Sequence, residues 1–257
     1  MVFEQTKQLS GAIISKLVPQ CDFSRIILVR GHMRCGSTAL SNIFCSRSDI
    51  SGYGEAHIDY RRRSAPGVLV LNQVRYRAWK PRAHWLFDKI LHNRYDRSAN
   101  LDGARQVFIC RKPAQSIASI CNLFRQIGSD EYTSETEAAE YYESRVETLL
   151  DAVSRLDQHH AIITHQQLVE NPEAVLNGIS RRLALSPPLE NRYVSNALST
   201  TRRGAGDPLV SGKWDRIVKD GAGTVAGKRP ALQLKDSHLQ RLDDLYHEFE
   251  RACTSAG

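Results

Sequence analysis

The stretch RIILVRGHMRCGSTALSNIF, residues 25–44, decides the fold. Its first part contains an apolar run rich in β-branched side chains, IILV at 26–29, and this pattern predicts a buried strand over residues 25–30. Gly31 and Gly36 bound a turn, and a helix with its apolar side chains on one face is expected from about Ser37. The stretch therefore predicts a strand, a tight turn and a helix, the repeating unit of α/β proteins.

The rest of the chain continues this alternation. We expect strands at 83–91, 104–110 and 161–168, and helices that begin near Pro113 and Pro172 or cover 136–157 and 235–251. Strands that alternate with helices predict an α/β fold with a central parallel β-sheet flanked by helices, and ligands at the carboxyl ends of the strands. We expect a single domain over residues 1–257, with a helical N-terminal extension at 1–22 and an irregular loop at 199–230 that covers the cofactor.

The composition is typical of a globular protein. Of the 257 residues, 41% are hydrophobic and 25% charged, and no apolar run has the length of a membrane span or the character of a signal peptide. The six cysteines lie far apart without a C-x-x-C pair, which favours the reducing cytoplasm. We find no metal-ligand cluster, zinc-finger spacing or RNA-binding aromatic signature, so neither a metal nor nucleic acid is expected as a partner.

The net charge of +7 is compatible with an anionic small ligand, nucleic acid or an anionic membrane surface. The densest basic cluster, YRRRSAP at 60–66, is typical of a solvated loop. Charge alone therefore does not select the ligand.

The glycine-containing turn has half of a phosphate-binding motif. Gly31 and Gly36 have the spacing of the P-loop G-x-x-x-x-G-K-[ST], but Ser37 stands in the place of the lysine. The positive charge lies instead at Arg34, whose guanidinium can hold two oxygens of a phosphate or sulfate. Backbone N–H groups at the helix start, with the hydroxyls of Ser37 and Thr38, complete an anion site that differs from that of NTPases.

The segment RCGST, residues 34–38, resembles the 5′-phosphosulfate loop of the sulfotransferases that use PAPS, 3′-phosphoadenosine 5′-phosphosulfate. In that family a Lys or Arg is followed by S-G-[ST]-[ST]. Cys35 replaces the usual serine and Ala39 departs from the frequent apolar residue, so the family roles of these side chains are not carried over. Cys35 nevertheless stays in the loop that we expect to bind the cofactor.

A second motif lies after the strand at 104–110. Arg111 is followed eight residues later by Ser119, a pattern similar to the family's 3′-phosphate site, R-[DN]-P with a serine at that spacing. An arginine at a strand end and a hydroxyl on the next helix can bind a phosphate that carries nearly two charges, and ATP has no such group. The resemblance implies a P-loop-containing nucleotide-hydrolase-like sulfotransferase fold of bacterial type, with PAPS as donor and PAP as product.

A third segment, GYGEAHIDY at 52–60, supplies candidates for the general base. Glu55 lies 21 residues after Arg34, the same interval that leads to a catalytic glutamate in the tyrosylprotein branch of the family. A base is needed because the acceptor hydroxyl must lose a proton as it attacks sulfur. His57 and, as a third choice, His92 are alternatives, because imidazole titrates near neutrality.

Two lysines complete the residues that the resemblance implies. Lys89 resembles a strand-end lysine of the tyrosylprotein branch that balances charge at the transferring sulfuryl group. Lys213, in SGKW, resembles the S-K-W lysine that contacts the phosphosulfate, and Ser199 stands 14 residues before it, as a ligand-binding serine does in that branch. Trp214 is either a packing anchor or a lid over the nucleotide.

The sequence thus predicts a sulfotransferase that moves a sulfuryl group from PAPS to a hydroxyl of a small molecule and releases PAP, with Arg34 serving in both binding and catalysis. The alternatives are a P-loop kinase or other NTPase that binds ATP with Mg²⁺, and a non-catalytic basic protein that binds nucleic acid or other anions. Segments 56–82 and 122–140 are expected to border the acceptor pocket. Their arginine, tyrosine and tryptophan side chains suit sugars, phenols, lipids and peptides alike, and the oligomeric state is not predicted.

Overall fold

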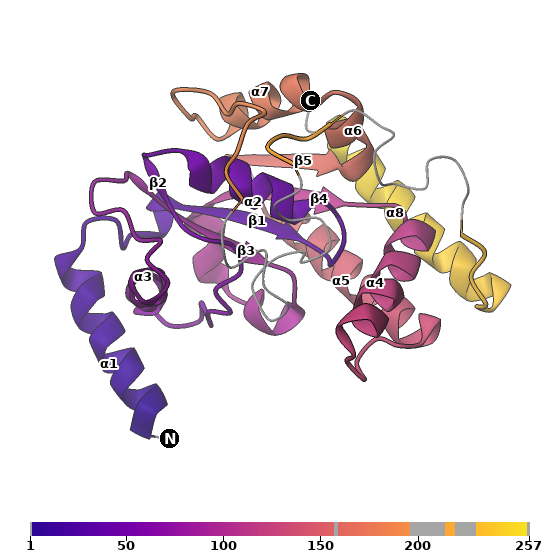
Figure 1. Cartoon of the computed structure of the whole chain (residues 1–257), viewed down its shortest axis with the longest axis horizontal. Coiled ribbons are helices and arrows are strands. Elements are labelled where there is room, and N and C mark those ends of the chain that lie inside the picture. Colours follow the sequence, from indigo (N-terminus) through magenta and orange to yellow (C-terminus); the bar gives the residue numbers. More distant parts are fainter. Residues whose placement is uncertain (1, 157–158, 196–213, 219–229, 256–257) are drawn as a thin grey trace.

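The computed structural model describes residues 2–156, 159–195, 214–218 and 230–255 (Figure 1). Its centre is a parallel sheet of five strands in the order β2-β3-β1-β4-β5. The strands are β1 (Ile26–Gly31), β2 (Ile50–Ser51), β3 (Trp85–Ile90), β4 (Arg105–Cys110) and β5 (His160–Thr164). The predicted α/β fold with a central parallel sheet is therefore confirmed.

The strand predicted from the opening stretch, β1, is the middle strand of the sheet. Val29 pairs in register with Lys89 of β3 on one side and with Val107 of β4 on the other. All six residues of β1 are buried. A strand that has neighbours on both edges and helices on both faces is buried all round. Its sequence therefore tends to be a continuous apolar run rather than an alternation of apolar and polar residues.

Helices cover both faces of the sheet. The described helices are α1 (Val2–Leu17), α2 (Ser37–Ser46), α3 (Ala65–Arg75), α4 (Pro113–Ile127), α5 (Glu135–Ser154), α6 (His165–Glu170), α7 (Pro172–Arg182) and α8 (Asp236–Ser255), with short 3₁₀ turns at Phe23–Arg25, Asn93–Tyr95 and Ala99–Gly103. Figure 1 shows α2 and α7 above the sheet and α3, α4 and α5 below it.

The core divides along these two faces. On one face, Val29 and Phe87 pack with apolar side chains of α2 and α7. On the other face, Leu28 packs with α3, and Phe108 packs with α5 and α8. Because residues alternate between faces along each strand, both clusters draw on the same strands. The loops at the carboxyl ends of these strands are thus held on a packed base.

Two local predictions need correction. The segment 161–168 is not one strand, because β5 ends at Thr164 and α6 begins at His165. Thr164 and Gln167 form a capping box, in which the Thr164 hydroxyl accepts from the Gln167 N–H at 3.1 Å and Gln167 Oε1 accepts from the Thr164 N–H at 2.8 Å. This reciprocal pair starts a helix where the apolar pattern alone suggested a longer strand. No element was expected within 56–82, yet α3 lies there.

Candidate functional site

The site lies where the loops after β1, β3, β4 and β5 meet at the carboxyl edge of the sheet. The turn between β1 and α2 needs a left-handed backbone at Arg34 (φ 67°) and at Gly36 (φ 92°). A Cβ atom at Gly36 would lie 3.0 Å from the His165 ring. Glycine therefore lets the start of α2 approach β5 closely, and the first N–H groups of α2 lie at this edge, where an anion can bind.

Two arginines from different strand ends meet beside this turn. Arg34 Nε donates to Ser119 Oγ at 2.8 Å, and Arg111 Nη1 donates to the carbonyl of Arg34 at 3.1 Å. Arg111 Nε also donates to Gln115 Oε1 at 3.3 Å. Burial, and next the charge of Arg34, lowers the pKa of Arg111. Within the described part of the chain, no carboxylate forms an ion pair with Arg111. The two guanidinium groups form a concentration of positive charge that an anion would relieve.

The remaining residues of the turn differ in what they can offer a ligand. Ser37 is buried and Thr38 is half-buried at the start of α2. The Cys35 side chain is fully buried in the core, and burial raises its pKa. Cys35 can therefore contribute backbone to an anion site, but not its thiol.

A buried histidine fixes the shape of the same loop. His32 Nδ1 lies 2.8 Å from the carbonyl of Met33, and its Nε2 accepts from the N–H of Arg111 at 2.9 Å. Because one ring nitrogen must accept, the other must be the donor to the carbonyl. Burial lowers the pKa of His32 to about 3, so the ring is neutral. The neutral ring links the loop after β1 to the end of β4.

Helix α5 supports these loops from below. The Tyr141 hydroxyl accepts from the Met33 N–H and donates to the carbonyl of Leu91, both at 2.8 Å. The Tyr142 hydroxyl donates to the carbonyl of Arg111 at 2.8 Å. One helix therefore ties together the loops that follow β1, β3 and β4.

One turn further along α5, a cluster of buried charges lies beneath the loops. Arg145 is fully buried and donates to the carbonyls of Gly31 at 2.7 Å and Ile90 at 2.9 Å. It also pairs with Asp96, which forms a second ion pair with Arg30 at 2.7 Å. Two arginines share one carboxylate, so the cluster places net positive charge behind the anion site.

The predicted base, Glu55, lies at the same edge, in the loop between β2 and α3. Its side chain is 9% exposed. Glu55 Oε1 lies 3.6 Å from His57 Nδ1 and 4.0 Å from His92 Nε2. Burial lowers the pKa of His92, and the charge of Glu55 opposes that shift. In the regions that the structure describes, Glu55 Oε1 accepts no hydrogen bond, although it is buried. A buried carboxylate oxygen without a donor is available to a ligand proton.

Lys89 is the next-to-last residue of β3 and is 2% exposed. It lies on the face of Phe87 and Val29, the face that α2 covers. Its register partner is Val29, two residues before Gly31, so Lys89 lies near the glycine turn, and its positive charge partly offsets the rise in the pKa of Cys35.

The structure thus brings Arg34, Arg111 and Ser119 into one cluster, and Glu55, His57 and His92 into a second. Tyr141 lies between them, because its hydroxyl accepts from the N–H of Met33, the residue before Arg34, and its ring centre lies 5.8 Å from that of His92. Trp214 is half-buried. Ser199 and Lys213 lie outside the described residues, as do most residues of the predicted covering loop.

Sequence analysis missed His165, the first residue after β5. Burial, and next the charge of Arg111, lowers the pKa of His165 to about 3. It lies against Gly36 at the carboxyl edge. A signal was present, since a polar residue follows the apolar run at 161–163, and residues at strand ends lie where ligands bind in parallel sheets. The longer strand predicted there hid it.

Taken together, these clusters can bind an anionic group at the arginines and remove a proton at the carboxylate. Among the described helices none is long and apolar enough to cross a membrane. All six cysteines are free thiols.

Known proteins resemble this chain in fold. No family model and no curated protein sequence matches the chain. The structure is similar to the sulfotransferase domain from the curacin biosynthetic pathway, with a TM-score of 0.54, 18% identity, and coverage of 86% of this chain and 96% of that one. It also matches sulfotransferase STF9 from Mycobacterium avium, with a TM-score of 0.47, 13% identity, and coverage of 96% and 81%. A sulfotransferase from Alicyclobacillus acidocaldarius matches with a TM-score of 0.46, 11% identity, and coverage of 90% and 94%. The first of these likenesses carries the assignment of the fold.

Proposed function

We propose that this chain, which has the sulfotransferase fold, transfers a sulfuryl group from PAPS to a hydroxyl of a small-molecule acceptor and releases PAP. The observation that supports this most strongly is the half-buried Arg111. It lies beside Arg34 and Ser119 with no carboxylate partner in the described residues. A phosphate dianion would satisfy such a site, because it accepts several charge-assisted hydrogen bonds at once.

The donor has two anionic groups, and the cluster can hold both. The backbone of Arg34, Cys35 and Gly36, with the hydroxyls of Ser37 and Thr38, would hold the 5′-phosphosulfate at the start of α2. Arg111 and Ser119 would hold the 3′-phosphate. The hydrogen bond between Arg34 and Ser119 makes the two subsites neighbours. Ser199, Lys213 and Trp214 are assigned to the same ligand by family resemblance alone.

On the acceptor side, Glu55 would receive the proton. The acceptor oxygen forms a bond to sulfur while the bond from sulfur to the phosphate oxygen breaks. The electron pair leaves with PAP, and the acceptor proton moves to Glu55 Oε1. This oxygen is buried and accepts no hydrogen bond from the described residues, so it is free for that proton. Lys89 would stabilise charge at the transferring group, with Arg34 acting beside it. His57 and His92 remain the alternative bases.

The alternatives explain less of the site. A kinase or NTPase would need a lysine in the loop, and Ser37 occupies that place. ATP also lacks a 3′-phosphate for Arg111. A protein that only binds polyanions has no use for a buried carboxylate oxygen that accepts no hydrogen bond from the described residues.

Thermal unfolding with three nucleotides tests the proposal. We expect PAP to raise the melting temperature by several degrees, because a ligand at about 100 times its Kd adds about 2.7 kcal/mol of stability. AMP, which lacks the 3′-phosphate, should give a much smaller shift at equal concentration. A shift with ATP and Mg²⁺ alone would support the kinase, and no shift with any nucleotide would support the anion-binding protein.

A further inference from the structure

Glu55 carries no secondary structure of its own, since it lies in the loop between β2 and α3. Its backbone is nevertheless held on both sides. The Ala56 N–H donates to Asp88 Oδ1 at 2.8 Å, and the Ala56 carbonyl accepts from Asn72 Nδ2 at 3.2 Å. The Gly54 carbonyl accepts from the Lys89 N–H at 3.2 Å. These contacts fix the two peptides that flank Glu55.

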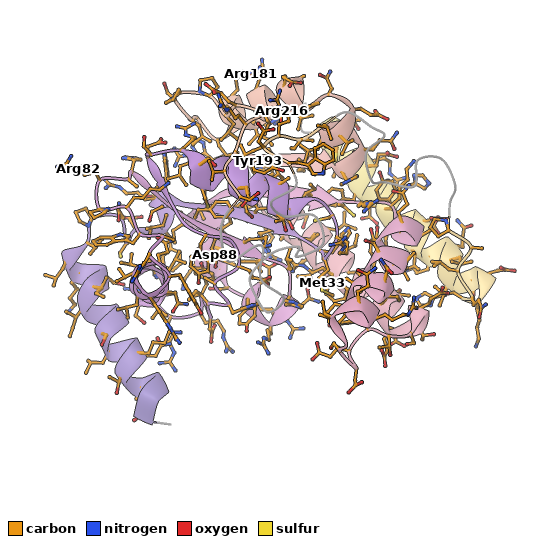
Figure 2. All side chains as sticks on the ribbon, in the orientation of Figure 1. Met33, Arg82, Asp88, Arg181, Tyr193 and Arg216 are labelled. Atoms are coloured by element: carbon orange, nitrogen blue, oxygen red, sulfur yellow. The ribbon has the colours of Figure 1, made fainter. Side chains whose placement is uncertain are left out.

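Asp88 is the central partner in this arrangement. It precedes Lys89 in β3 and is labelled in Figure 2. Because side chains alternate along a strand, Asp88 lies on the opposite face of the sheet from Lys89, the side that α3 covers. Its Oδ1 accepts from the N–H groups of both Ala56 and Lys89 at 2.8 Å, and its Oδ2 accepts from the Tyr60 hydroxyl at 2.6 Å. The carboxylate thus joins β3, the Glu55 loop and the turn before α3.

Burying the Asp88 carboxylate costs free energy, and this cost indicates that the position of the carboxylate serves a purpose. Asp88 is 1% exposed, and no lysine, arginine or histidine forms an ion pair with it in the described parts of the chain. Burial raises the pKa of Asp88 to about 7, and the nearby charge of Glu55 contributes to the rise. A buried, unpaired carboxylate persists only where its hydrogen bonds compensate for lost hydration.

We propose that Asp88 is a positioning residue for Glu55, which it holds against His57 and His92 through the Ala56 N–H. Asp88 itself touches no reacting atom, because its carboxylate lies on the α3 side of the sheet and each of its oxygens accepts from a protein donor. This inference rests on the proposed function for its kinetic consequences, but not for its geometry.

Two substitutions separate hydrogen bonding from charge. Asp88→Ala removes all three accepted bonds and should lower kcat by about 100-fold, the effect of a displacement of about 1 Å in a catalytic group. The Kd for PAP should stay within about 2-fold, because the arginine cluster is separate. Asp88→Asn keeps an oxygen for the two N–H groups, and its amide can donate to Tyr60. It should restore kcat to within about 5-fold of the original chain. Equal losses in both variants would overturn the proposal.

A double-mutant cycle with Glu55→Gln gives the sharper test. If Asp88 acts only through Glu55, the pair Asp88→Ala and Glu55→Gln should be no slower than Glu55→Gln alone. An additional loss of about 100-fold in that background would contradict the positioning role.

Ser180→Ala in α7 is the matched control, because Ser180 is equally buried and accepts the Leu189 N–H at 2.8 Å far from Glu55. It should leave kcat unchanged.

The His92 imidazole provides a readout without turnover. Burial, Glu55, His57, Arg145 and Arg94 all act on its pKa, and Glu55 is the contributor that raises it. In NMR titrations, Glu55→Gln should lower the His92 pKa, and Asp88→Ala should shift it in the same direction. A shift in the first variant without one in the second would overturn the proposal.

A second variant covers the case in which Asp88→Ala fails to fold. Asn72→Ala removes the other hydrogen bond to the Ala56 backbone and should produce a smaller shift of the His92 pKa in the same direction. If His92 responds as expected while PAP does not bind, the proposed function fails and the positioning role stands.

Discussion

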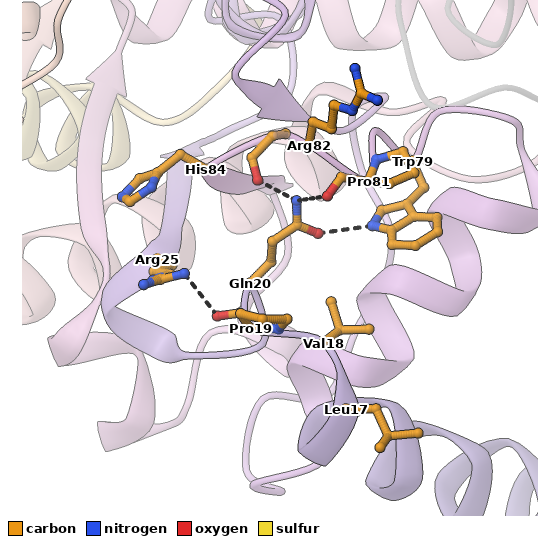
Figure 3. Close-up of a pocket in the computed structure, with 10 residues that line it drawn as sticks. Leu17, Val18, Pro19, Gln20, Arg25, Trp79, Pro81, Arg82 and His84 are labelled. Atoms are coloured by element: carbon orange, nitrogen blue, oxygen red, sulfur yellow. Dashed lines mark hydrogen bonds between the residues drawn. The ribbon is translucent and has the colours of Figure 1, made fainter.

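Two polar regions at opposite edges of the sheet differ in whether the protein itself satisfies the hydrogen bonds of their polar groups. At the amino edge, the segment before β1 and the loop before β3 enclose a pocket of about 390 Å³ around Gln20 (Figure 3). Gln20 Nε2 donates to the carbonyls of Lys80, at 3.1 Å, and of Ala83, while its Oε1 accepts from Trp79 Nε1 at 2.9 Å. The polar atoms of this side chain are satisfied by the protein itself.

At the carboxyl edge, the protein leaves polar groups for another molecule. Glu55 Oε1 is buried without a donor, and Arg111 has no carboxylate partner, as far as the described residues extend. We therefore place the candidate site at the carboxyl edge, where a buried carboxylate oxygen without a hydrogen bond lies at the same edge as the arginines that follow β1 and β4. Polar groups that the protein satisfies stabilise the fold, whereas those it leaves open cost stability and favour a ligand.

The largest expected effect comes from Glu55, whose Oε1 accepts no hydrogen bond from the described residues. Glu55→Gln keeps the shape of the side chain but removes its basicity, so kcat should fall by about 100- to 1,000-fold. The Kd for PAP, measured by calorimetry, should hardly change. His57→Gln is the matched control, because His57 lies 3.6 Å from the same oxygen. Full activity of the Glu55 variant, or a larger loss in the histidine variant, would remove Glu55 from its role as base.

The second largest effect comes from Arg111, which has no carboxylate partner in the described residues. Arg111→Ala should weaken PAP binding by about 10- to 100-fold, since hydrogen bonds to charged groups contribute about 1.5–3 kcal/mol. It should not lower the melting temperature of the free protein, because it relieves repulsion with Arg34. Lys112→Ala, at the exposed next position, should change neither quantity. Unchanged PAP affinity in the Arg111 variant would rule out the 3′-phosphate site.

The satisfied glutamine should behave in the opposite way. Gln20→Ala leaves Trp79 Nε1 and several carbonyls without their partner, so the free energy of unfolding in urea should fall by about 2 kcal/mol. PAP affinity and kcat should stay the same, because the pocket lies at the other edge of the sheet. A loss of PAP affinity in this variant would break the comparison.

The last prediction concerns pH. The pKa of His165 is about 3, below its ordinary value of 6.5, so the unfolded chain binds more protons between these values. The contribution of His165 to stability is therefore fully present above about pH 6.5 and declines as the pH falls toward 3. His165→Asn should flatten the dependence of unfolding free energy on pH by up to about 1.4 kcal/mol per pH unit between pH 4 and 6. Urea unfolding of both proteins at several pH values measures this difference, and parallel curves would contradict it.

The strand ends and turns that carry Arg34 and Arg111 could be predicted from the sequence because this part of the fold is local. The strand, turn and helix at 25–44 form one continuous unit, and Arg111 directly follows a strand in register with it. Residues at strand ends in a parallel sheet converge without further information. The contact between Arg34 and Ser119 follows from that convergence.

The other half depends on contacts between distant segments. Tyr141 reaches Met33 across 108 positions, and Asp88 reaches Ala56 across 32. In the sequence, Tyr141 lies in a periodic helix and Asp88 in an apolar strand, and neither pattern shows which backbone groups these side chains satisfy. The helix α3 was missed for a related reason, because its apolar run lacks charged residues that would mark an amphipathic period.

The most direct test of the account is a calorimetric comparison of PAP with AMP in the original chain and in Arg111→Ala. We expect the original chain to bind PAP about 100-fold more tightly than AMP, and this preference to disappear in the variant, because the 3′-phosphate then has no guanidinium partner. An equal preference in both proteins, or none in the original chain, would contradict the claim that the open arginine at the carboxyl edge recognises the donor.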